Sequence, residues 1–381
     1  MKRLFLIINE DRFFLSHRSP IAEEAVKDGW HVTLVTKDTG KRAEIERLGY
    51  DYIELPINPT GMNPADELKT FRFLYKLIRH NPDAIIHLVG LKNMMWGGLA
   101  ARFAKAGGIV FAVSGLGTLF GENKSYLISK GVQFLMKRGM RNRNIAVIFQ
   151  NHDDQKLFKE NGIFKNGHEF FIKGSGVNLD EYSYSAPDED NPVIKIIFTA
   201  RMLREKGVED LVAAAELLRK DYEGRVEFLL CGGLSDNPNA LSEEEMNKLC
   251  DGKYIKWLGH RNDVADLLKS SHIVCFPSYY REGVPKSLIE ASASGRPIVT
   301  TNSVGCRDTV EEGKNGFIVE PHSPDSIASA LRLLIENKEL RREMGVYSRK
   351  LSERDYDIKN VTATHLKIYN LLNAGNRKKK D

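Results

Sequence analysis

The sequence lacks the long apolar segments of membrane-spanning and secreted proteins. Its first stretch, MKRLFLIINEDRFF, has an apolar run of only five residues, Leu4–Ile8, before Asn9 and Glu10 interrupt it. A signal peptide needs a longer apolar region, and a membrane-spanning helix needs roughly 20 apolar residues, a length that no run approaches. We therefore expect a cytoplasmic protein that does not cross a membrane.

Residues that bind metals or form disulfides are also few. The four cysteines show no C-x-x-C spacing, and the ten histidines form no H-x-x-H or H-E-x-x-H pattern. Two of the cysteines lie in apolar strand contexts, where a free buried thiol is the usual state. We expect no metal site and no cofactor.

Length and charge bound what the chain can be. With 381 residues it exceeds the size of a single core, so two domains are expected. Residues 1–185 hold 26 Lys and Arg against 20 Asp and Glu, whereas residues 186–381 hold 30 against 31. A basic first half favours an anionic partner, such as a phosphorylated acceptor or an anionic membrane surface. Nucleic acid is not expected, because no zinc-finger or RNA-recognition signature accompanies the charge.

Short apolar runs alternate with segments of helical period throughout the first half. This alternation predicts a parallel sheet with helices on both faces, a doubly wound α/β domain. The expected strands are Leu4–Ile8, Val32–Val35, Tyr52–Leu55, Ala84–Leu88, Ile109–Val113, Ala146–Phe149 and Glu169–Lys173. The expected helices are Ile21–Lys27, Asp66–Arg79, Met94–Ala104 and Ser125–Met140.

A Pro-, Ser- and acid-rich segment, Tyr182–Pro192, predicts a linker, after which the alternation restarts. We expect one domain at 1–184, a second at 185–356, and a C-terminal helix with a basic tail at 357–381. The expected strands here are Val193–Ala200, Val226–Leu230, Tyr254–Leu258, His272–Phe276 and Pro297–Thr301. The expected helices are Val208–Lys220, Ser242–Leu249, Val264–Lys269, Lys286–Ser294, Asp325–Glu336, Lys338–Leu351 and Val361–Leu372.

The rest of the chain is organised around Pro277–Asp308, which reads as a loop, a helix and a strand after an apolar strand. Glu282 lies at the tip of the loop, and Glu290 lies inside the helix that Pro285 begins. N–H groups at a helix N-terminus attract phosphate, and carboxylates accept hydrogen bonds from hydroxyls. The pairing suits a ligand that carries both a sugar and a diphosphate. The alternative is that one acid only stabilises the start of the helix and the other is an ordinary core glutamate.

A second phosphate-binding pattern follows the first strand of the second half. Arg201 and Lys206 lie on either side of a short loop that ends in Gly207. Doubly wound sheets bind ligands at such loops, which follow the carboxyl ends of the strands. Cations at this place would stabilise negative charge on a departing diphosphate. The alternative is a pair of surface cations at a strand–helix turn.

These motifs together resemble the retaining glycosyltransferase family 4. The resemblance rests on PSYYREGVPKSLIEA followed by GRPIVTTNSVG, on the segment from Ala200 to Gly207, and on GSGVN at 174–178. It implies the GT-B architecture: α/β, with two doubly wound Rossmann-like domains facing across a cleft, and a tail helix that returns to the first domain. The stretch CGGLSDNP at 231–238 further resembles a subgroup that adds N-acetylhexosamines, often N-acetylgalactosamine (GalNAc), to polyprenyl-diphosphate-linked sugars in bacteria.

The resemblance also implies residue roles on the donor side. Arg201 and Lys206 would contact the donor diphosphate, Glu282 the sugar hydroxyls and Glu290 the ribose hydroxyls. Arg201, Lys206 and Glu282 are thus the catalytic candidates. Further donor contacts would come from the helix start and from the turn that receives the nucleobase, at Gly283, Val284, Lys286, Ser287, Leu288, Gly259 and His260. The alternative for His260 is an exposed loop histidine.

Acceptor-side candidates follow two strands of the first half. Arg18 could meet an acceptor phosphate, while Ser16 and His17 are either acceptor contacts or helix caps. Relatives often carry a histidine near the donor sugar, but the corresponding place here, around Ser114 and Gly115, has none. No general base is assigned, and the resemblance implies that the donor phosphate itself takes the acceptor proton.

Two superficial motifs are set aside. Asp188-Glu189-Asp190 is a literal D-x-D, but it lies in a Pro-flanked linker and not at a strand end, so a metal role is not expected. The glycines of Gly115–Gly121 follow the fifth strand with the wrong spacing for a dinucleotide fingerprint.

Six Lys and Arg lie among apolar residues between Lys124 and Arg143. Such a basic amphipathic helix either lies on an anionic bilayer or packs its apolar face on the sheet.

The sequence therefore predicts a metal-independent retaining glycosyltransferase. It would move a sugar, such as GalNAc, from a UDP-sugar to a polyprenyl-diphosphate-linked saccharide, at the inner face of the cytoplasmic membrane. Its partners would be the nucleotide sugar, the lipid-linked acceptor and an anionic membrane surface. Two alternatives are a sugar-nucleotide epimerase of the same fold and a nucleotide-sugar-binding protein without catalytic activity.

Overall fold

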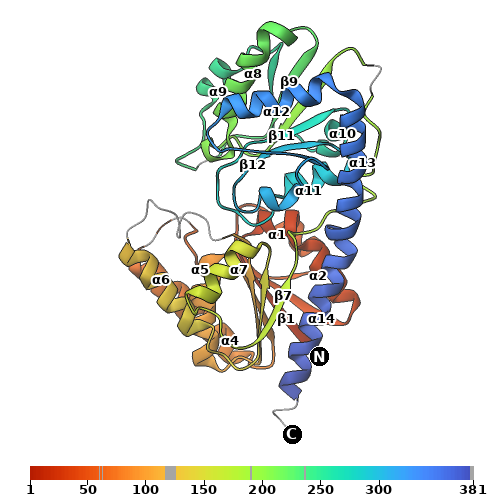
Figure 1. Cartoon of the computed structure of the whole chain (residues 1–381). Helices are drawn as coiled ribbons and strands as arrows, with labels where there is room; N and C mark the ends of the chain where they lie inside the picture. The colour runs from red at the N-terminus through yellow and green to blue at the C-terminus, as the bar shows by residue number, and fades with distance from the viewer. Residues whose placement is uncertain (60, 62, 116–125, 189–190, 236, 378–381) are drawn as a thin grey trace. The chain divides into compact units, whose positions relative to one another are not determined.

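The computed structural model describes residues 1–59, 61, 63–115, 126–188, 191–235 and 237–377. The chain divides into two compact units (Figure 1). The first comprises Met1–Ser175 together with Ile358–Asp381, and the second comprises Gly176–Asp357. The C-terminal segment therefore belongs to the first unit, as the resemblance implies.

The first unit is built on a seven-stranded parallel sheet in the order β3-β2-β1-β4-β5-β6-β7. The strands are β1 Lys2–Glu10, β2 Trp30–Lys37, β3 Asp51–Glu54, β4 Ile85–Val89, β5 Gly108–Val113, β6 Ile145–Phe149 and β7 His168–Phe171. The helices are α1 Asp11–His17, α2 Ser19–Lys27, α3 Arg42–Arg47, α4 Pro64–His80, α5 Leu91–Ala104, α6 Tyr126–Gly139, α7 His152–Glu160 and α14 Ile358–Arg377.

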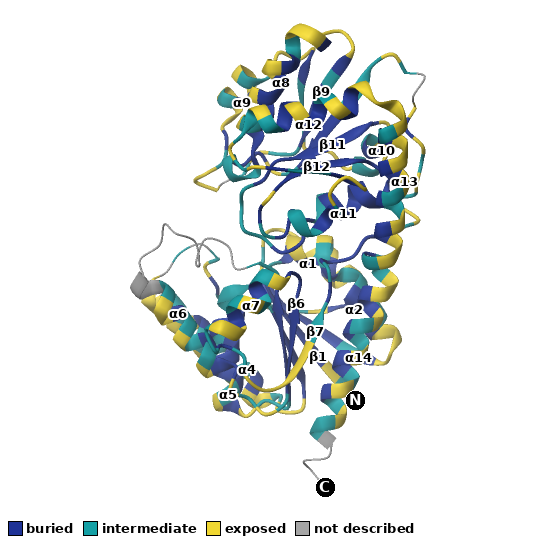
Figure 2. Ribbon diagram, viewed as in Figure 1, coloured by how far each residue is buried: buried dark blue, intermediate teal, exposed yellow. Residues whose placement is uncertain are grey.

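Alternate residues of each strand feed two separate cores, as expected of a sheet buried on both faces. From β1, Phe5 and Ile7 pack with side chains of α4, α5, α6 and α7, whereas Leu4 and Leu6 pack with α1, α2 and α14. Figure 2 shows the strands of this sheet mostly buried between helices whose outer faces are exposed. The doubly wound fold expected for this half is thus confirmed.

The second unit repeats the pattern with a six-stranded parallel sheet in the order β10-β9-β8-β11-β12-β13 around one core. Its strands are β8 Ile194–Thr199, β9 Val226–Cys231, β10 Ile255–Gly259, β11 Ile273–Phe276, β12 Ile298–Thr301 and β13 Gly316–Val319. Its helices are α8 Val208–Tyr222, α9 Glu243–Leu249, α10 Val264–Lys269, α11 Lys286–Ala293, α12 Pro324–Glu336 and α13 Lys338–Asp355, with short 3₁₀ turns at Arg204–Lys206 and Arg307–Thr309.

Every strand and helix that the sequence predicts is present, within a few residues at most ends. Four elements were not predicted: α1, α3, α7 and β13. The first three are helices of nine residues or fewer, and β13 has only four residues, GFIV, after a polar turn. Elements this short give too little periodicity to be recognised.

The segment expected to be a linker packs on the second unit, so the units divide at Ser175 and Gly176 and not at 184. The N–H of Val177 donates to Tyr356 O at 2.8 Å. The buried guanidinium of Arg296 donates to the carbonyl and hydroxyl oxygens of Ser185. A composition rich in Pro and Ser marks irregular backbone, which in this chain lies against a domain surface.

Glycines let the loops at the carboxyl edge of the second sheet approach one another closely. A Cβ on Gly305, whose φ is +87°, would lie 1.6 Å from Gly283 O. A Cβ on Gly207 would lie 2.1 Å from Pro277 O, and one on Gly232 1.6 Å from Ala200 O. No other residue type fits at these positions, so the glycines fix how the loops stack.

We predict that Gly305→Ala destabilises the protein far more than Gly313→Ala. Gly313 has a similar φ of +73° but no atom within 4 Å of its Cβ position. The control should therefore lose only about 1–2 kcal/mol from the backbone conformation, and Gly305→Ala about 3 kcal/mol or more because of the clash. Urea unfolding measures both, and equal losses would contradict this account of the loop contact.

Candidate active site

The candidate site is formed by loops that leave the carboxyl ends of β8, β9, β10 and β11. Backbone hydrogen bonds join them: Ala200 N donates to Cys231 O at 3.0 Å, and Gly232 N donates to Gly259 O at 2.9 Å. In open parallel sheets this edge is where ligands bind. Most of the residues predicted for the donor side lie on these loops or on α11.

An ion pair links two of the predicted catalytic residues. Lys206 Nζ donates to both carboxylate oxygens of Glu282, at 2.7 and 2.8 Å, and Ser278 Oγ donates to the same carboxylate at 3.3 Å. The two charged side chains are only 12% and 18% exposed. Removal from water is costly for each charge alone, so each stabilises the other. The pair presents a cation and a carboxylate side by side.

Two aromatic rings lie near the ammonium group of this pair. Lys206 Nζ is 5.3 Å from the ring centroid of Phe276 and 5.6 Å from that of Tyr280. The charge of Arg201 also acts on Tyr280, where it lowers the pKa of a phenol that burial raises. Arg201 itself is exposed. The structure thus brings the cations Lys206 and Arg201 and the carboxylates of Glu282 and Glu205 around Tyr280.

The helix start lies next to Glu282 in the chain. Helix α11 begins after Pro285 without a side-chain cap, so its positive end is available to a ligand. Gly283 and Val284 are buried, and Lys286 and Ser287 are partly exposed. Leu288 differs from the other predicted donor contacts, because its side chain is fully buried in the core and its N–H donates to Pro285 O. Its role in the structure is to seat the helix.

Glu290 has partners of its own, which differ from those of the ion pair. It is buried on α11, where its carboxylate lies 3.4 Å from Lys286 Nζ and is hydrogen-bonded to the Tyr182 hydroxyl. Burial raises the pKa of Glu290, and the charge of Lys286 opposes this rise. The structure records no direct contact of Glu290 with Lys206 or Glu282, so the donor-side carboxylates form two separate binding points.

The predicted nucleobase turn follows β10. Gly259 has a φ of +65° and ends the strand, and His260 is exposed beside Gly233. An exposed histidine fits both the nucleobase contact and the alternative of an ordinary loop histidine.

The acceptor-side candidates differ in accessibility. Ser16 and His17 lie inside α1, where Ser16 Oγ donates to Arg12 O at 2.9 Å. The capping interpretation of these two residues is therefore wrong, because no side chain caps α2. Ser114 and Gly115 follow β5, and Gly115 has a φ of +99°.

Arg18 is buried, which the sequence did not indicate. The residue is 4% exposed, and its Nε has no hydrogen-bond partner. Burial lowers the pKa of His87 and of His365, and the charge of Arg18 lowers both further. His87 Nδ1 and the Tyr369 hydroxyl are 2.7 Å apart in the same cluster. Arg18 therefore lies beneath α14, and a phosphate could reach only its edge.

Four residues in contact with the site were not predicted as site residues: Phe276, Ser278, Tyr280 and Tyr182. Ser278 and Tyr280 lie inside the motif that carried the resemblance, where their position beside Glu282 was a usable signal. The sequence gave no such signal for Tyr182, because it is far from Glu290 in the chain and lies in the segment expected to be a linker.

In the described parts of the chain, no group of three or more His, Cys, Asp or Glu could hold a metal ion. Of the D-x-D sequence, Glu189 and Asp190 lie outside the described residues, as do most of the glycines of Gly115–Gly121. None of the helices described is long and apolar enough to cross a bilayer.

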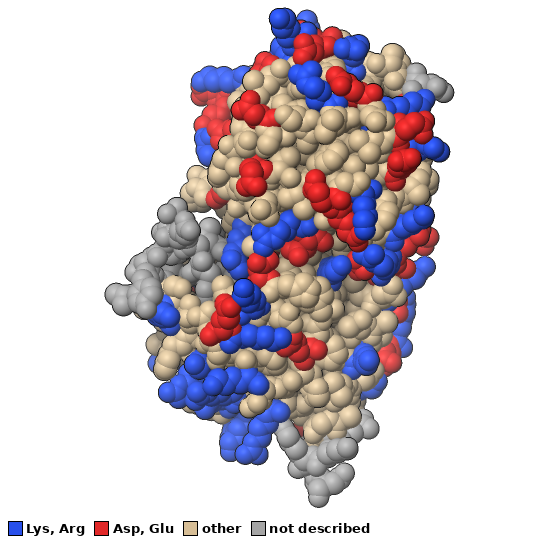
Figure 3. Space-filling model, in the orientation of Figure 1, with Lys and Arg blue, Asp and Glu red and all other residues tan. Residues whose placement is uncertain are grey.

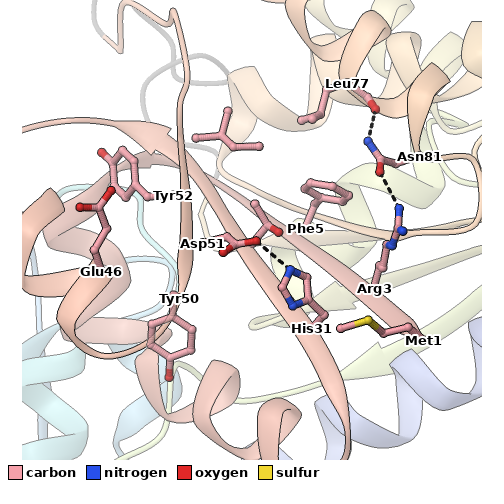
Figure 4. Close-up of a pocket in the computed structure, with 12 residues that line it drawn as sticks. Met1, Arg3, Phe5, His31, Glu46, Tyr50, Asp51, Tyr52, Leu77 and Asn81 are labelled. Atoms are coloured by element: carbon pink, nitrogen blue, oxygen red, sulfur yellow. Dashed lines mark hydrogen bonds and ion pairs between the residues drawn. The ribbon is translucent and has the colours of Figure 1, made fainter.

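A cavity of about 700 Å³ lies elsewhere, at the amino ends of β1, β2 and β3 (Figure 4). Its polar groups bond to each other: His31 Nε2 is 2.7 Å from the Asp51 carboxylate, and Arg3 donates to Asn81 at 3.0 Å. Ligands bind parallel sheets at the opposite edge, so we do not place the reaction here.

We predict that Lys206→Ala lowers the free energy of unfolding by about 1–3 kcal/mol, because it leaves the Glu282 carboxylate without its partner. In a Glu282→Gln background the same change should cost much less. Urea unfolding of the two single variants and the double variant gives the coupling energy. Additive effects would mean that the two charges do not stabilise each other.

Comparisons with known proteins agree with this arrangement. The family models "Glycosyl transferase 4-like" and "Glycosyl transferases group 1" match residues 3–151 and 185–351. An N,N'-diacetylbacillosaminyl-diphospho-undecaprenol alpha-1,3-N-acetylgalactosaminyltransferase of Campylobacter jejuni is 27% identical, over 93% of this chain and 97% of its own length. A UDP-Gal:alpha-D-GlcNAc-diphosphoundecaprenol alpha-1,3-galactosyltransferase of Escherichia coli is 23% identical, over 81% of each chain.

Solved structures share the fold. Alr3699/HepE of Anabaena, crystallised in complex with UDP, has a TM-score of 0.74 at 18% identity and covers 96% of this chain and 99% of its own. Sucrose-phosphate synthase of Thermosynechococcus elongatus has a TM-score of 0.77 at 18% identity, with 98% and 100% covered. The GT-B architecture of two parallel-sheet α/β domains is thereby confirmed. With family models on both halves and the Lys206–Glu282 pair at the ligand-binding edge, the chain belongs to the group 1 and 4-like glycosyltransferases and is an enzyme of that class.

Proposed function

We propose that the protein transfers a sugar from a UDP-sugar to a saccharide carried on polyprenyl diphosphate, with retention at the anomeric carbon and without a metal. The observation that carries the proposal is the partly buried pair of Lys206 and Glu282 beside the uncapped start of α11. A cation and a helix N-terminus suit a diphosphate, and the adjacent carboxylate suits sugar hydroxyls.

The donor diphosphate would lie against Lys206 and Arg201, with the positive end of α11 on its other side. When the bond between the sugar C1 and the diphosphate oxygen breaks, negative charge develops on that oxygen. Cations and helix-end N–H groups fixed in place stabilise such charge without reorganising. This replaces the role that a bound metal ion plays in other transferases.

The hydroxyl groups of the donor would bind the two carboxylates. Glu282 would accept from sugar hydroxyls, held in position by Lys206 and Ser278, and Glu290 would accept from the ribose. The acceptor hydroxyl then forms the new bond to C1 on the face that the diphosphate leaves. Its proton passes to the departing phosphate oxygen, so no general base from the protein is needed.

Two relatives support the acceptor and the sugar. The names of both include a sugar on diphospho-undecaprenol, and the one from Campylobacter jejuni is an N-acetylgalactosaminyltransferase. That relative matches this chain over nearly its whole length. We propose an N-acetylhexosamine such as GalNAc as the donor sugar. Ser16, His17, Ser114, Gly115 and the edge of Arg18 remain the proposed acceptor contacts.

The first unit offers a basic and aromatic surface for an anionic membrane. From Ala84 to Gln150 the sequence holds nine Lys and Arg and one acidic residue, Glu122. Lys and Arg gather on the lower left of the first unit in Figure 3, over the region where Figure 1 shows α4 and the end of α6. Helix α5 packs against both α4 and α6.

Aromatic residues lie in the same helical layer. Phe71 of α4 contacts the rings of Trp96 and Phe103 on α5, and Phe103 is 62% exposed. On α6, Val132 and Met136 pack into the core, whereas Phe134 is exposed under the guanidinium of Arg138. The helix thus packs an apolar face in the core, as one interpretation of its sequence expects, and exposes Phe134 and Arg138 on another face. Aromatic and basic side chains together favour a bilayer interface, which supports a peripheral location at the inner face of the cytoplasmic membrane.

The transfer reaction is tested with a set of UDP-sugars and a polyprenyl-diphosphate-linked saccharide, with UDP release and the elongated acceptor as readouts. We predict transfer that requires the acceptor, needs no added divalent metal, and slows by about 100-fold or more in Lys206→Ala. Substitution of Lys248, an exposed lysine of the same unit, should leave the rate unchanged.

Each alternative activity gives a different result in this assay. An isomerised sugar formed from the donor alone would show an epimerase. Binding of UDP-sugars without transfer or hydrolysis would show a binding protein. Inversion of the anomeric configuration in the product would overturn the retaining mechanism alone.

Membrane binding is tested by sedimentation with vesicles that contain anionic lipid at low salt. We predict that Lys130→Glu combined with Arg138→Glu weakens binding by about 10-fold or more. The matched variant, Lys220→Glu with Lys253→Glu, changes the same charge on exposed positions of the second unit and should bind like the wild type. Equal binding of both variants would remove α6 from the membrane surface.

A further inference from the structure

Glu290 is the most deeply buried carboxylate of the proposed donor site. Its side chain is 11% exposed, and its recorded partners are Lys286 on the same helix, at 3.4 Å, and the hydroxyl of Tyr182. A carboxylate offers about four lone-pair positions for hydrogen bonds. Two partners therefore leave room for a ligand that brings two more donors.

Tyr182 is held in place from both sides. It is 8% exposed and packs in the core of the second unit, and its N–H donates to Asn178 O at 2.9 Å. Arg349 of α13 donates to the carbonyl oxygen of Tyr182 at 3.0 Å and to that of Ala293, at the end of α11, also at 3.0 Å. One guanidinium thus fixes the backbone of Tyr182 relative to the helix that carries Glu290.

We infer that Tyr182 is a positioning residue for the nucleotide-binding carboxylate of Glu290, and that it thereby sets the preference for a ribonucleotide with both ribose hydroxyls. This inference rests on the proposed function, in which Glu290 binds the ribose. The tyrosine hydroxyl occupies one lone pair of Glu290 and fixes the rotation of the carboxylate. The remaining lone pairs then face the ligand in a defined direction.

Position matters here because a vicinal diol needs two acceptors at fixed geometry. Side chains that are held by packing lose little entropy when a ligand binds. A glutamate that can rotate would bind a deoxyribose, which has one of the two hydroxyls, nearly as tightly as a ribose. The cost of losing the Tyr182 hydroxyl should therefore fall mainly on the discrimination between ribose and deoxyribose.

The hydrogen bond also favours the ionised form of Glu290. The groups that act on this carboxylate are Lys286 on α11, Tyr182, and Glu181 in the preceding segment, whose charge opposes that of Glu290. Burial raises the pKa of Glu290, and the Tyr182 hydroxyl lowers it. Without the hydroxyl the pKa rises further, so Glu290 becomes protonated, and loses acceptor capacity, at a higher pH than in the wild type.

The test compares UDP with 2′-deoxy-UDP by calorimetry on the full chain, across a range of pH. For the wild type we expect UDP to bind about 10-fold or more tightly than 2′-deoxy-UDP, as for a hydrogen bond to a charged group. In Tyr182→Phe we expect UDP to bind about 5-fold more weakly, the preference for UDP to shrink, and the loss of affinity on acidification to begin at a higher pH.

Tyr222→Phe is a matched control. Tyr222 is also a buried tyrosine of the second unit, and its hydroxyl donates to Glu336 at 2.5 Å. Its removal deletes a tyrosine–glutamate hydrogen bond of the same kind without touching α11. Thermal unfolding of both variants verifies that each is folded. The control should keep the wild-type affinity, preference and pH dependence.

The possible outcomes separate this inference from the proposed function. If the wild type does not bind UDP, the proposed donor is wrong. If it binds UDP and 2′-deoxy-UDP equally, Glu290 does not read the ribose and the inference is overturned with it. If the wild type prefers UDP but Tyr182→Phe keeps the same preference and pH profile, the donor site stands and the positioning role of Tyr182 is overturned.

Discussion

The site depends on an ion pair between two charges that neither the sheet nor the helices could hold alone. Lys206 follows β8 and Glu282 follows β11, 76 residues later in the chain. Parallel pairing of β11 with β8 places both strand ends at one edge, and the loops then bring the ammonium group and the carboxylate into contact. Because each charge is mostly shielded from water, the pair holds only while both loops keep their positions.

Glycines and two arginines, one buried and one partly exposed, maintain those positions. Gly207 lets the loop of Lys206 lie against Pro277. Gly305 lets its own loop lie against Gly283, the residue after Glu282. Further from the edge, Arg296 and Arg349 use backbone carbonyls as partners and tie the segment around Tyr182 and Ser185 to the second unit. These backbone contacts add to the apolar packing of Val284 and Leu288 in the core of the second unit.

Sequence reasoning recovered the frame of this molecule and part of its site. Strict alternation of strands and helices defined the two sheets, and the loops after their strands marked where Arg201, Lys206 and Glu282 would lie. It could not find contacts between residues far apart in the chain, such as Tyr182 with Glu290. It also could not foresee that Arg18 is buried, because a loop arginine between two short helices looks like a surface residue, or that the Pro-rich segment packs on a domain. The basic segment of α6 was ambiguous for a physical reason: one face packs on the sheet while the other carries the charge.

The central claim is that Lys206 and the start of α11 bind the diphosphate of a nucleotide sugar, with Glu282 beside the sugar. A crystal structure of the protein with UDP tests it most directly. The account predicts the diphosphate at the carboxyl edge of the second sheet, with Lys206 Nζ and Arg201 within hydrogen-bonding distance and the ribose at Glu290. A diphosphate bound elsewhere, or bound here without contact to Lys206, would contradict it.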